Sequence, residues 1–98
     1  MMKEVEEIRV RKETESKKLA SAVVNSVRKG KIPQVVAVGA AASHKAVIAL
    51  AIARGILFTE GMAITATPHL KKVKMPDGDV RTAVVLTVVA APVVGGGA

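Results

Sequence analysis

The chain has 98 residues, of which 50% are hydrophobic, and its 15 Lys and Arg against 8 Asp and Glu give a formal net charge of +7. The large apolar fraction excludes a disordered basic tail and predicts one small folded domain. With one Phe and no Trp or Tyr, the chain is not a protein that stacks bases on aromatic platforms. The lack of Cys excludes disulfides, thiolate metal sites and a Cys nucleophile.

The two ends of the chain differ in composition. Residues 1–18 are charged throughout and contain no apolar run, so we expect no signal peptide and a cytoplasmic, nucleoid-associated protein. Residues 82–98 are uncharged, but the stretch is short for a membrane span and contains Pro92 and several glycines, so no membrane association is expected. Residues 92–98 have no side-chain pattern and predict a flexible Gly-rich tail, which leaves residues 1–91 as the single domain.

The first predicted element is a short strand over residues 5–11. Ile8 and Val10 fall on one face of this strand, and Arg9 and Arg11 fall on the other. This alternation is typical of a strand that is buried on one side only.

A helix is predicted from Ser16 to a stop at Gly30, because apolar residues recur at every fourth position from Leu19 onwards. Either Thr14 or Ser16 can cap its start.

Residues 34–38 form a continuous β-branched run that predicts an interior strand. After a loop of small residues, Ser43 is expected to cap a second helix over residues 44–54, which closes at Gly55. This second helix is apolar nearly all round, so it should pack on the sheet with one face and on another surface with the opposite face. A second protomer is the simplest candidate for that other surface.

Two more strands are predicted, over residues 62–67 and 80–90, with a turn at Met75–Gly78 between them. The predicted order is β-α-β-α-β-β. Right-handed crossovers then place both helices on one side of the sheet. The expected fold is an α/β two-layer sandwich with a four-stranded mixed sheet and two helices on one face.

Basic side chains cluster in the predicted hairpin and at the predicted start of the first helix. From charge alone, solvation of an apolar protein and nucleic-acid binding explain the lysines about equally well. The presence of two clusters on separate elements, with Lys45 near another helix start, favours binding to a phosphate backbone without sequence selection. The predicted contacts from the two clusters are Lys17, Lys18, Lys71, Lys72 and Lys74.

The segment from Gly39 to Lys45 leads from a strand into a helix, where backbone N–H groups attract anions. Ser43, His44 and Lys45 are therefore candidates for binding one phosphate of a nucleic acid. The segment lacks the spacings GxGxxG and GxxxxGK[ST], so a dedicated nucleotide site is the least favoured alternative. Close packing of the helix on the sheet is the simpler explanation for the small residues.

No residue pattern points to catalysis or to a metal. Neither His44 nor His69 has a carboxylate or Cys at metal-ligand spacing, and no Ser has a visible base and acid partner. We therefore expect no enzyme, no metal and no cofactor. Arg54 and Arg81 are assigned structural roles, in the last turn of the second helix and at the start of the final strand.

Three blocks resemble the stage V sporulation protein S family: QVVAV at 34–38, GAAASHKAVIALAIARGI at 39–56 and RTAVVLTV at 81–88. The resemblance extends from about Glu6 to Val89. It implies an Alba-like fold, because that family is similar to the Alba proteins, small basic chromatin and RNA-binding proteins that work as homodimers with the same element order.

The resemblance also implies roles for individual positions. Lys17 and Lys18 match the lysine pair of Alba proteins, whereas the sporulation family has an uncharged stretch there. His44 and Lys45 replace an Asn-Gln pair of that family, while Ile48 replaces a lysine.

In Alba proteins the hairpin arms embrace the duplex, which assigns the three hairpin lysines to the minor groove or its phosphates. Leu57 and Phe58 match the apolar pair through which Alba dimers associate, and Leu50 joins them as a predicted dimer or dimer–dimer contact. The alternative for Leu57 and Phe58 is that they belong to the core.

The sequence thus predicts a homodimer that binds DNA or RNA through the phosphate backbone, in a chromatin-architectural, nucleoid-architectural or regulatory role, and that can assemble further on the nucleic acid. The alternative is a sporulation or developmental regulator that acts through protein–protein contacts and does not bind nucleic acid. Its lysines would then only keep an apolar dimer soluble.

Overall fold

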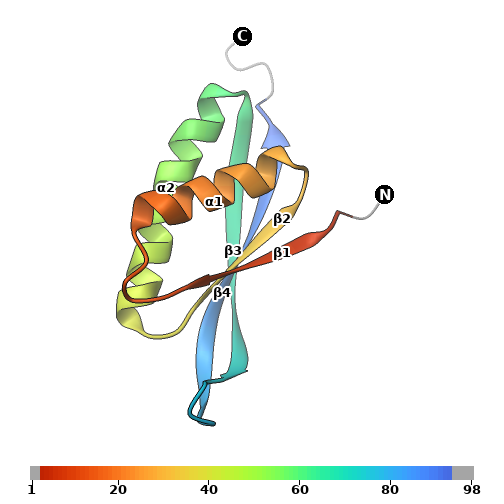
Figure 1. The fold of residues 1–98 in the computed structure, drawn as a ribbon. Coiled ribbons are helices and arrows are strands. Elements are labelled where there is room, and N and C mark those ends of the chain that lie inside the picture. Colours follow the sequence, from red (N-terminus) through yellow and green to blue (C-terminus); the bar gives the residue numbers. More distant parts are fainter. Residues whose placement is uncertain (1–2, 94–98) are drawn as a thin grey trace.

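Strands and helices alternate up to the second helix, and the chain then ends in a long hairpin. The computed structural model describes residues 3–93. The elements in chain order are β1 (Val5–Val10), α1 (Ser16–Arg28), β2 (Ile32–Ala37), α2 (Ala40–Thr59), β3 (Met62–Lys74) and β4 (Val80–Pro92). This order confirms the predicted fold class, a four-stranded mixed sheet with two helices (Figure 1).

The four strands lie in the order β1-β2-β4-β3. β1 runs parallel to β2, with Ile8 opposite Val35, and β4 runs antiparallel to both β2 and β3. β1 and β3 are therefore the edge strands. Pro68 lies in the middle of β3, opposite Leu86, a position that is tolerated because an edge strand needs no N–H donor on its open side.

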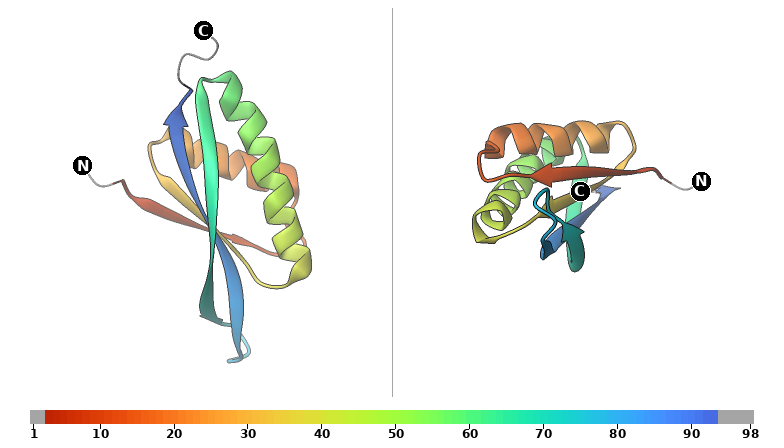
Figure 2. Two further views of the ribbon diagram at one scale, coloured as in Figure 1. Left: turned by 180° about the vertical axis from the view of Figure 1, so that it is seen from behind. Right: turned by 60° about the horizontal axis from the view of Figure 1, so that its bottom comes forward.

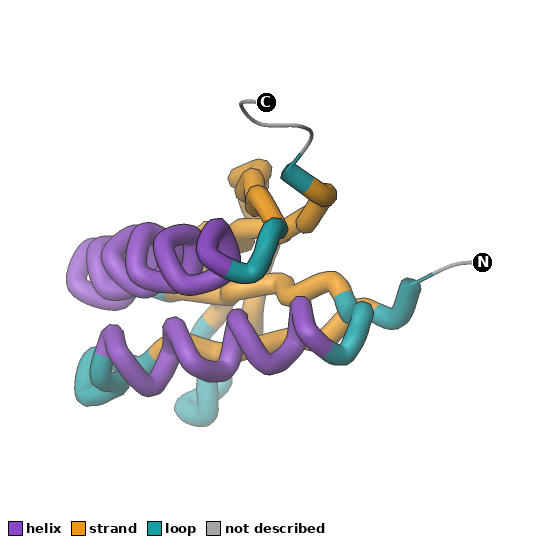
Figure 3. The backbone as a smooth tube through the Cα atoms, turned by 90° about the horizontal axis from the view of Figure 1, so that it is seen from above, coloured by secondary structure: helices purple, strands orange, loops and turns teal. Residues whose placement is uncertain are grey.

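The main core lies between the sheet and both helices, which are seen beside one another in Figure 3. Val23 of α1, Val35 of β2 and Val88 of β4 are almost completely buried in it. On α2 the core positions are mostly alanines, and Ala46 and Ala53 are fully buried. These small side chains let the α2 backbone approach its neighbours closely. A second, smaller apolar cluster is formed by β2, β3 and β4 and is centred on Val36, Val73, Ala83 and Val85.

α2 is longer at both ends than the sequence predicted. It begins at Ala40 with Gly39 as its N-cap residue, so Ser43 lies inside the helix and caps nothing. The φ of Gly39 is 91°, a left-handed conformation that suits glycine, and the alanines that follow are strong helix formers. At the other end the helix continues through Gly55 to Thr59, and Gly61, with φ 81°, ends the turn that follows.

The start of α1 is also capped differently. Glu15 is the N-cap residue and its side chain makes no capping hydrogen bond. The hydroxyl of Thr14 instead accepts a hydrogen bond from the backbone N–H of Arg11 at 2.9 Å, within the loop that leads into the helix.

The ends of the two helices are joined by an ion pair. The Arg28 guanidinium donates two hydrogen bonds to the Glu60 carboxylate, one of them from Nε at 3.0 Å. This hydrogen bonding lowers the pKa of Glu60 below its ordinary value of 4.5 and raises the pKa of Arg28. The pair fixes the end of α1 against the residue that follows α2.

The third strand extends well past its predicted end and forms a projecting hairpin with β4. The last pair between β2 and β4 is Ala37 with Val84, so residues 71–83 project beyond the rest of the sheet. We call these residues the arm; its turn comes forward in the right-hand view of Figure 2. The predicted turn at Met75–Gly78 is present, with Gly78 at φ 88° and its N–H bonded to the Met75 carbonyl at 2.8 Å.

The first two positions of the predicted tail belong to the sheet or are bonded next to it. Pro92 is the last residue of β4, and the N–H of Val93 donates to the Gly61 carbonyl at 2.8 Å. The remaining tail positions, 94–98, lie outside the described residues.

Candidate nucleic-acid interface

One end of the sheet carries the loops that lead into both helices and the turn of the arm (Figure 1). Because β1 and β2 are parallel, the loops that follow them lead to α1 and α2 at the same end of the sheet. β4 is antiparallel to β2, so the β3–β4 turn lies at that end as well. The Lys45 ammonium donates to the Lys12 carbonyl and thereby ties the first turns of α2 to the loop before α1. We call this region the loop end.

The loop end collects every residue that the sequence predicted to contact nucleic acid. Lys17 and Lys18 are exposed in the first turn of α1, and His44 is exposed in the second turn of α2. Ser43 and Lys45 beside it are half-buried. Neither helix has an acidic residue in its first turn, but Glu15, the N-cap residue of α1, places a carboxylate at the positive end of that helix. The N-cap residue of α2 is Gly39, so the positive end of the α2 dipole has no such carboxylate.

The three arm lysines do not form one stripe. Side chains alternate between the two faces of a strand, so Lys72 and Lys74 share one face and Lys71 lies on the other. Lys72 donates to the hydroxyl of Thr82, its partner on β4, at 2.9 Å. Lys71 reaches across the sheet to Glu7 at 3.4 Å.

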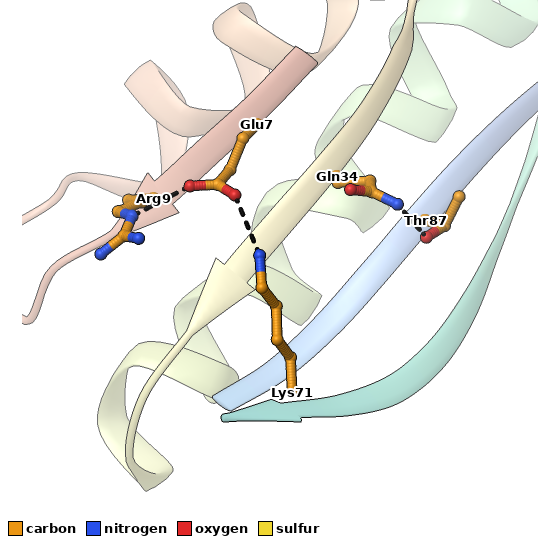
Figure 4. A network of polar contacts seen from close by, with 5 residues as sticks. All are labelled: Glu7, Arg9, Gln34, Lys71 and Thr87. Carbon is orange, nitrogen blue, oxygen red and sulfur yellow. Dashed lines mark hydrogen bonds and ion pairs between the residues drawn. The ribbon is translucent and has the colours of Figure 1, made fainter. Parts of the chain in front are cut away.

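Glu7 lies between two cations, as Figure 4 shows. Its carboxylate accepts a hydrogen bond from Arg9 Nε at 3.0 Å and another from Lys71. The Arg9 hydrogen bond is the main reason that the pKa of Glu7 is lowered, against a smaller opposing effect of desolvation. Because Glu7 already holds the Lys71 ammonium, a phosphate that binds Lys71 must compete with Glu7. The same view shows a separate hydrogen bond of 3.2 Å between Gln34 and Thr87.

A cleft of about 420 Å³ opens at the loop end, between the end of β1, β2 and the arm. We call it the arm cleft. Val36 and Val73 line it and are only 5% exposed. Its cationic lining residues were not predicted as site residues: Arg9, Arg11, Lys12 and Arg81. The sequence pattern places Arg9 and Arg11 on the face of the first strand that points away from the core. It does not show that the end of this strand lies close to the arm.

Arg81 and Arg54 have different surroundings from those expected. Arg81, predicted as a purely structural residue, lines the arm cleft. Arg54 is not in the last turn of α2, because the helix continues to Thr59, and its guanidinium lies 5.8 Å from the centroid of the Phe58 ring.

The predicted association residues separate into two groups. Leu57 is fully buried in the core of its own protomer, which agrees with the alternative that it belongs to the core and leaves it unavailable to a second copy. Leu50 is partly buried and packs against the same core. Phe58 is 51% exposed, and Val47 and Ile48 on α2 are also exposed, at 58% and 40%.

α2 is also long and apolar enough, by length and composition, to cross a membrane. Its buried alanines place it in the core of this domain. Among residues 3–93, no group of three or more His, Asp or Glu side chains could hold a metal ion.

The fold and the site together define a class: a small two-layer α/β domain that gathers lysines, arginines and two helix starts at one end. Within that class, the chain matches the family model described as stage V sporulation protein S over residues 6–91. The chain belongs to this family and is a sporulation-related protein. A comparison with curated proteins found no significant match.

Proposed function

We propose that this protein binds DNA or RNA through the phosphate backbone, without sequence selection, and that it does so as a homodimer in the cytoplasm. The observation that carries the proposal is the convergence of Lys17, Lys18 and Lys45 with the two helix starts and the arm at the loop end. The formal net charge of +7 agrees with a polyanionic partner. The role that follows is architectural or regulatory, and it involves no catalysis.

The binding chemistry follows from these groups. Each lysine that neutralises a phosphate releases condensed counterions, which makes the affinity depend on salt. The N–H groups at the start of a helix add a fixed positive potential that needs no side-chain ordering. Lys72 and Lys74, on one face of the projecting arm, extend the contact along the strand. None of these contacts distinguishes one base from another.

The homodimer is supported by the outer face of α2. Val47, Ile48 and Phe58 are exposed along it, and several large apolar side chains exposed on one helix favour a partner that covers them. A second copy that covers this face brings two loop ends to one assembly, as the similarity to Alba proteins implies. Such a dimer contacts about twice as many phosphates as one protomer.

The test is a salt titration of binding to unrelated DNA and RNA duplexes. We expect the logarithm of affinity to fall linearly with the logarithm of salt concentration, with a slope of about −0.9 per phosphate contacted on B-DNA. The double variant Lys17→Ala/Lys18→Ala should weaken binding to all sequences alike and make the slope less steep by about 1.8 per protomer engaged.

A matched control removes charge elsewhere. Lys29→Ala/Lys31→Ala takes the same charge from the opposite end of α1 and should change affinity less. No binding at low salt, or a strong preference for one sequence, would refute the proposal.

A second candidate function rests on the same apolar face of α2. If its partner is another protein, the family's sporulation role is carried by protein–protein contact and the lysines only keep the protein soluble. The two functions are separated by the ultraviolet absorbance of the purified protein. Because the chain lacks Trp and Tyr, co-purifying nucleic acid dominates the spectrum, and its absence at low salt favours the second function.

A further inference from the structure

The arm cleft combines a buried apolar floor with a cationic rim. Val36 and Val73, each 5% exposed, lie at its base, together with Val38 and Met75. Its volume of about 420 Å³ falls within the range of roughly 300–1,000 Å³ that is typical of small-ligand pockets. An array of surface lysines that binds only phosphates needs no such floor, because phosphates gain nothing from apolar contact.

The rim carries three arginines and a lysine: Arg9, Arg11, Arg81 and Lys12. Among the described residues that line the cleft, Glu13 is the one acidic side chain. The rim therefore attracts an anion. Arginine also has a second use, because its planar guanidinium stacks on the face of a nucleobase.

The ligand that matches both parts of the cleft is a nucleotide with an unpaired base. Its flat base buries its faces against the valines and Met75, whose sulfur makes favourable contacts with aromatic rings. Its phosphate and the neighbouring phosphates of the strand meet the arginines. A paired base inside a duplex cannot occupy this floor, because both of its faces are already stacked on its neighbours.

We propose that the arm cleft binds one unpaired nucleotide of a nucleic-acid strand, so that the protein prefers duplexes interrupted by an unpaired base. This inference rests on the proposed nucleic-acid binding and adds to it a structural preference that is independent of sequence. Arginine planes and aliphatic side chains take the place of the aromatic platforms that the chain lacks.

The test compares two DNA duplexes of equal length, one fully paired and one with a single extra adenine, replaced by a fluorescent purine analogue for detection. We expect the wild-type protein to bind the bulged duplex about tenfold more tightly, which corresponds to about 1.4 kcal/mol. The fluorescence of the analogue should change on binding, because the base moves into an apolar surrounding.

The variant Arg81→Lys keeps the charge of the exposed rim and removes one guanidinium plane. It should lose most of the preference for the bulge and retain its affinity for the paired duplex. Arg28→Lys, the same substitution at the opposite end of the molecule, should change neither value. The melting temperature of each variant verifies that it is folded.

The outcomes separate this inference from the function on which it rests. Equal affinity for the two duplexes, or an unchanged preference in Arg81→Lys, overturns the cleft assignment and leaves backbone binding intact. Binding to neither duplex at low salt overturns both. AMP alone supplies a base and one phosphate without a strand, so a saturable rise in melting temperature at millimolar AMP that is reduced in Arg81→Lys supports the cleft assignment.

Discussion

Glu7 controls how much positive charge the open face of the sheet offers. Its carboxylate bonds both Arg9 and Lys71, two cations that would otherwise face a phosphate. Surface ion pairs of this kind contribute little to stability, so their consequence is larger for binding than for folding.

We therefore expect Glu7→Gln to raise affinity for nucleic acid. The substitution removes a negative charge and frees Lys71, so the salt slope should become steeper by about 0.9 for each phosphate gained. Glu4→Gln is the matched control, because it makes the same change of charge just before β1 and leaves the Glu7 contacts intact. If the two variants show the same affinity, the local competition that we describe does not operate.

Single residues also show where sequence reasoning was limited. Lys17 and Lys18 could be placed in the first turn of α1 because the start of a helix has a local sequence signature. Leu57 could not be separated from Phe58, because on a helix that is apolar all round only the packing decides which side faces the core. Arg81 was missed because its neighbours in the arm cleft come from β1 and β2, far away in the sequence.

At the scale of elements, the paired ends of α1 and α2 predict a specific dependence of stability on pH. Hydrogen bonds from Arg28 lower the pKa of Glu60 from 4.5 in the folded state. A carboxyl group with a lowered folded-state pKa stabilises the protein above its unfolded-state pKa, and that stabilisation is lost as the pH falls through the folded-state pKa.

The difference in free energy of unfolding between the wild type and Glu60→Gln should thus favour the wild type at neutral pH and shrink steadily below about pH 4.5. Urea denaturation at a series of pH values measures it. Glu4→Gln provides the baseline for a carboxylate outside this pair. A difference that stays constant from neutral to acidic pH would contradict the assignment.

The boundaries of the elements were the weakest part of the sequence prediction, and the reasons are physical. Ser43 and Gly55 are ordinary signals for a helix start and a helix end, yet α2 runs through both. Buried contacts at Ala42 and Leu57 secure its two ends, and this packing outweighs the local preferences of a single serine or glycine. The arm was predicted too short because residues 68–74 lack the clean alternation of a half-buried strand.

At the scale of the whole molecule, the fold followed from the sequence because the period of the apolar residues changes clearly from strand to helix and back. The parallel pairing of β1 with β2 then follows from the handedness of the crossovers. The convergence at the loop end is a consequence of that topology. The arm cleft does not follow from the topology alone, because its shape depends on the twist of the sheet that brings the arm close to β1.

The proposed dimer makes a prediction at this scale. Val47→Glu and Phe58→Glu each place a charge on the exposed apolar face of α2 and should shift sedimentation equilibrium toward the monomer. The salt slope of nucleic-acid binding should fall to about half, since one loop end remains per particle. Ala22→Glu adds the same charge to an exposed position of α1 and should leave the dimer unchanged. A dimer that persists in both α2 variants would place the interface elsewhere.

Pro68 has a consequence for the size of the assemblies that this protein can form. β3 is a strand of 13 residues at the edge of the sheet, and an open edge of that length invites strands of other copies to pair with it. A proline has no N–H to offer on the open side, and the lysines that follow it repel a neighbouring copy. Pro68 and these lysines therefore disfavour edge-to-edge joining of copies into an endless sheet, so we expect the proposed dimer to form closed particles rather than fibrils.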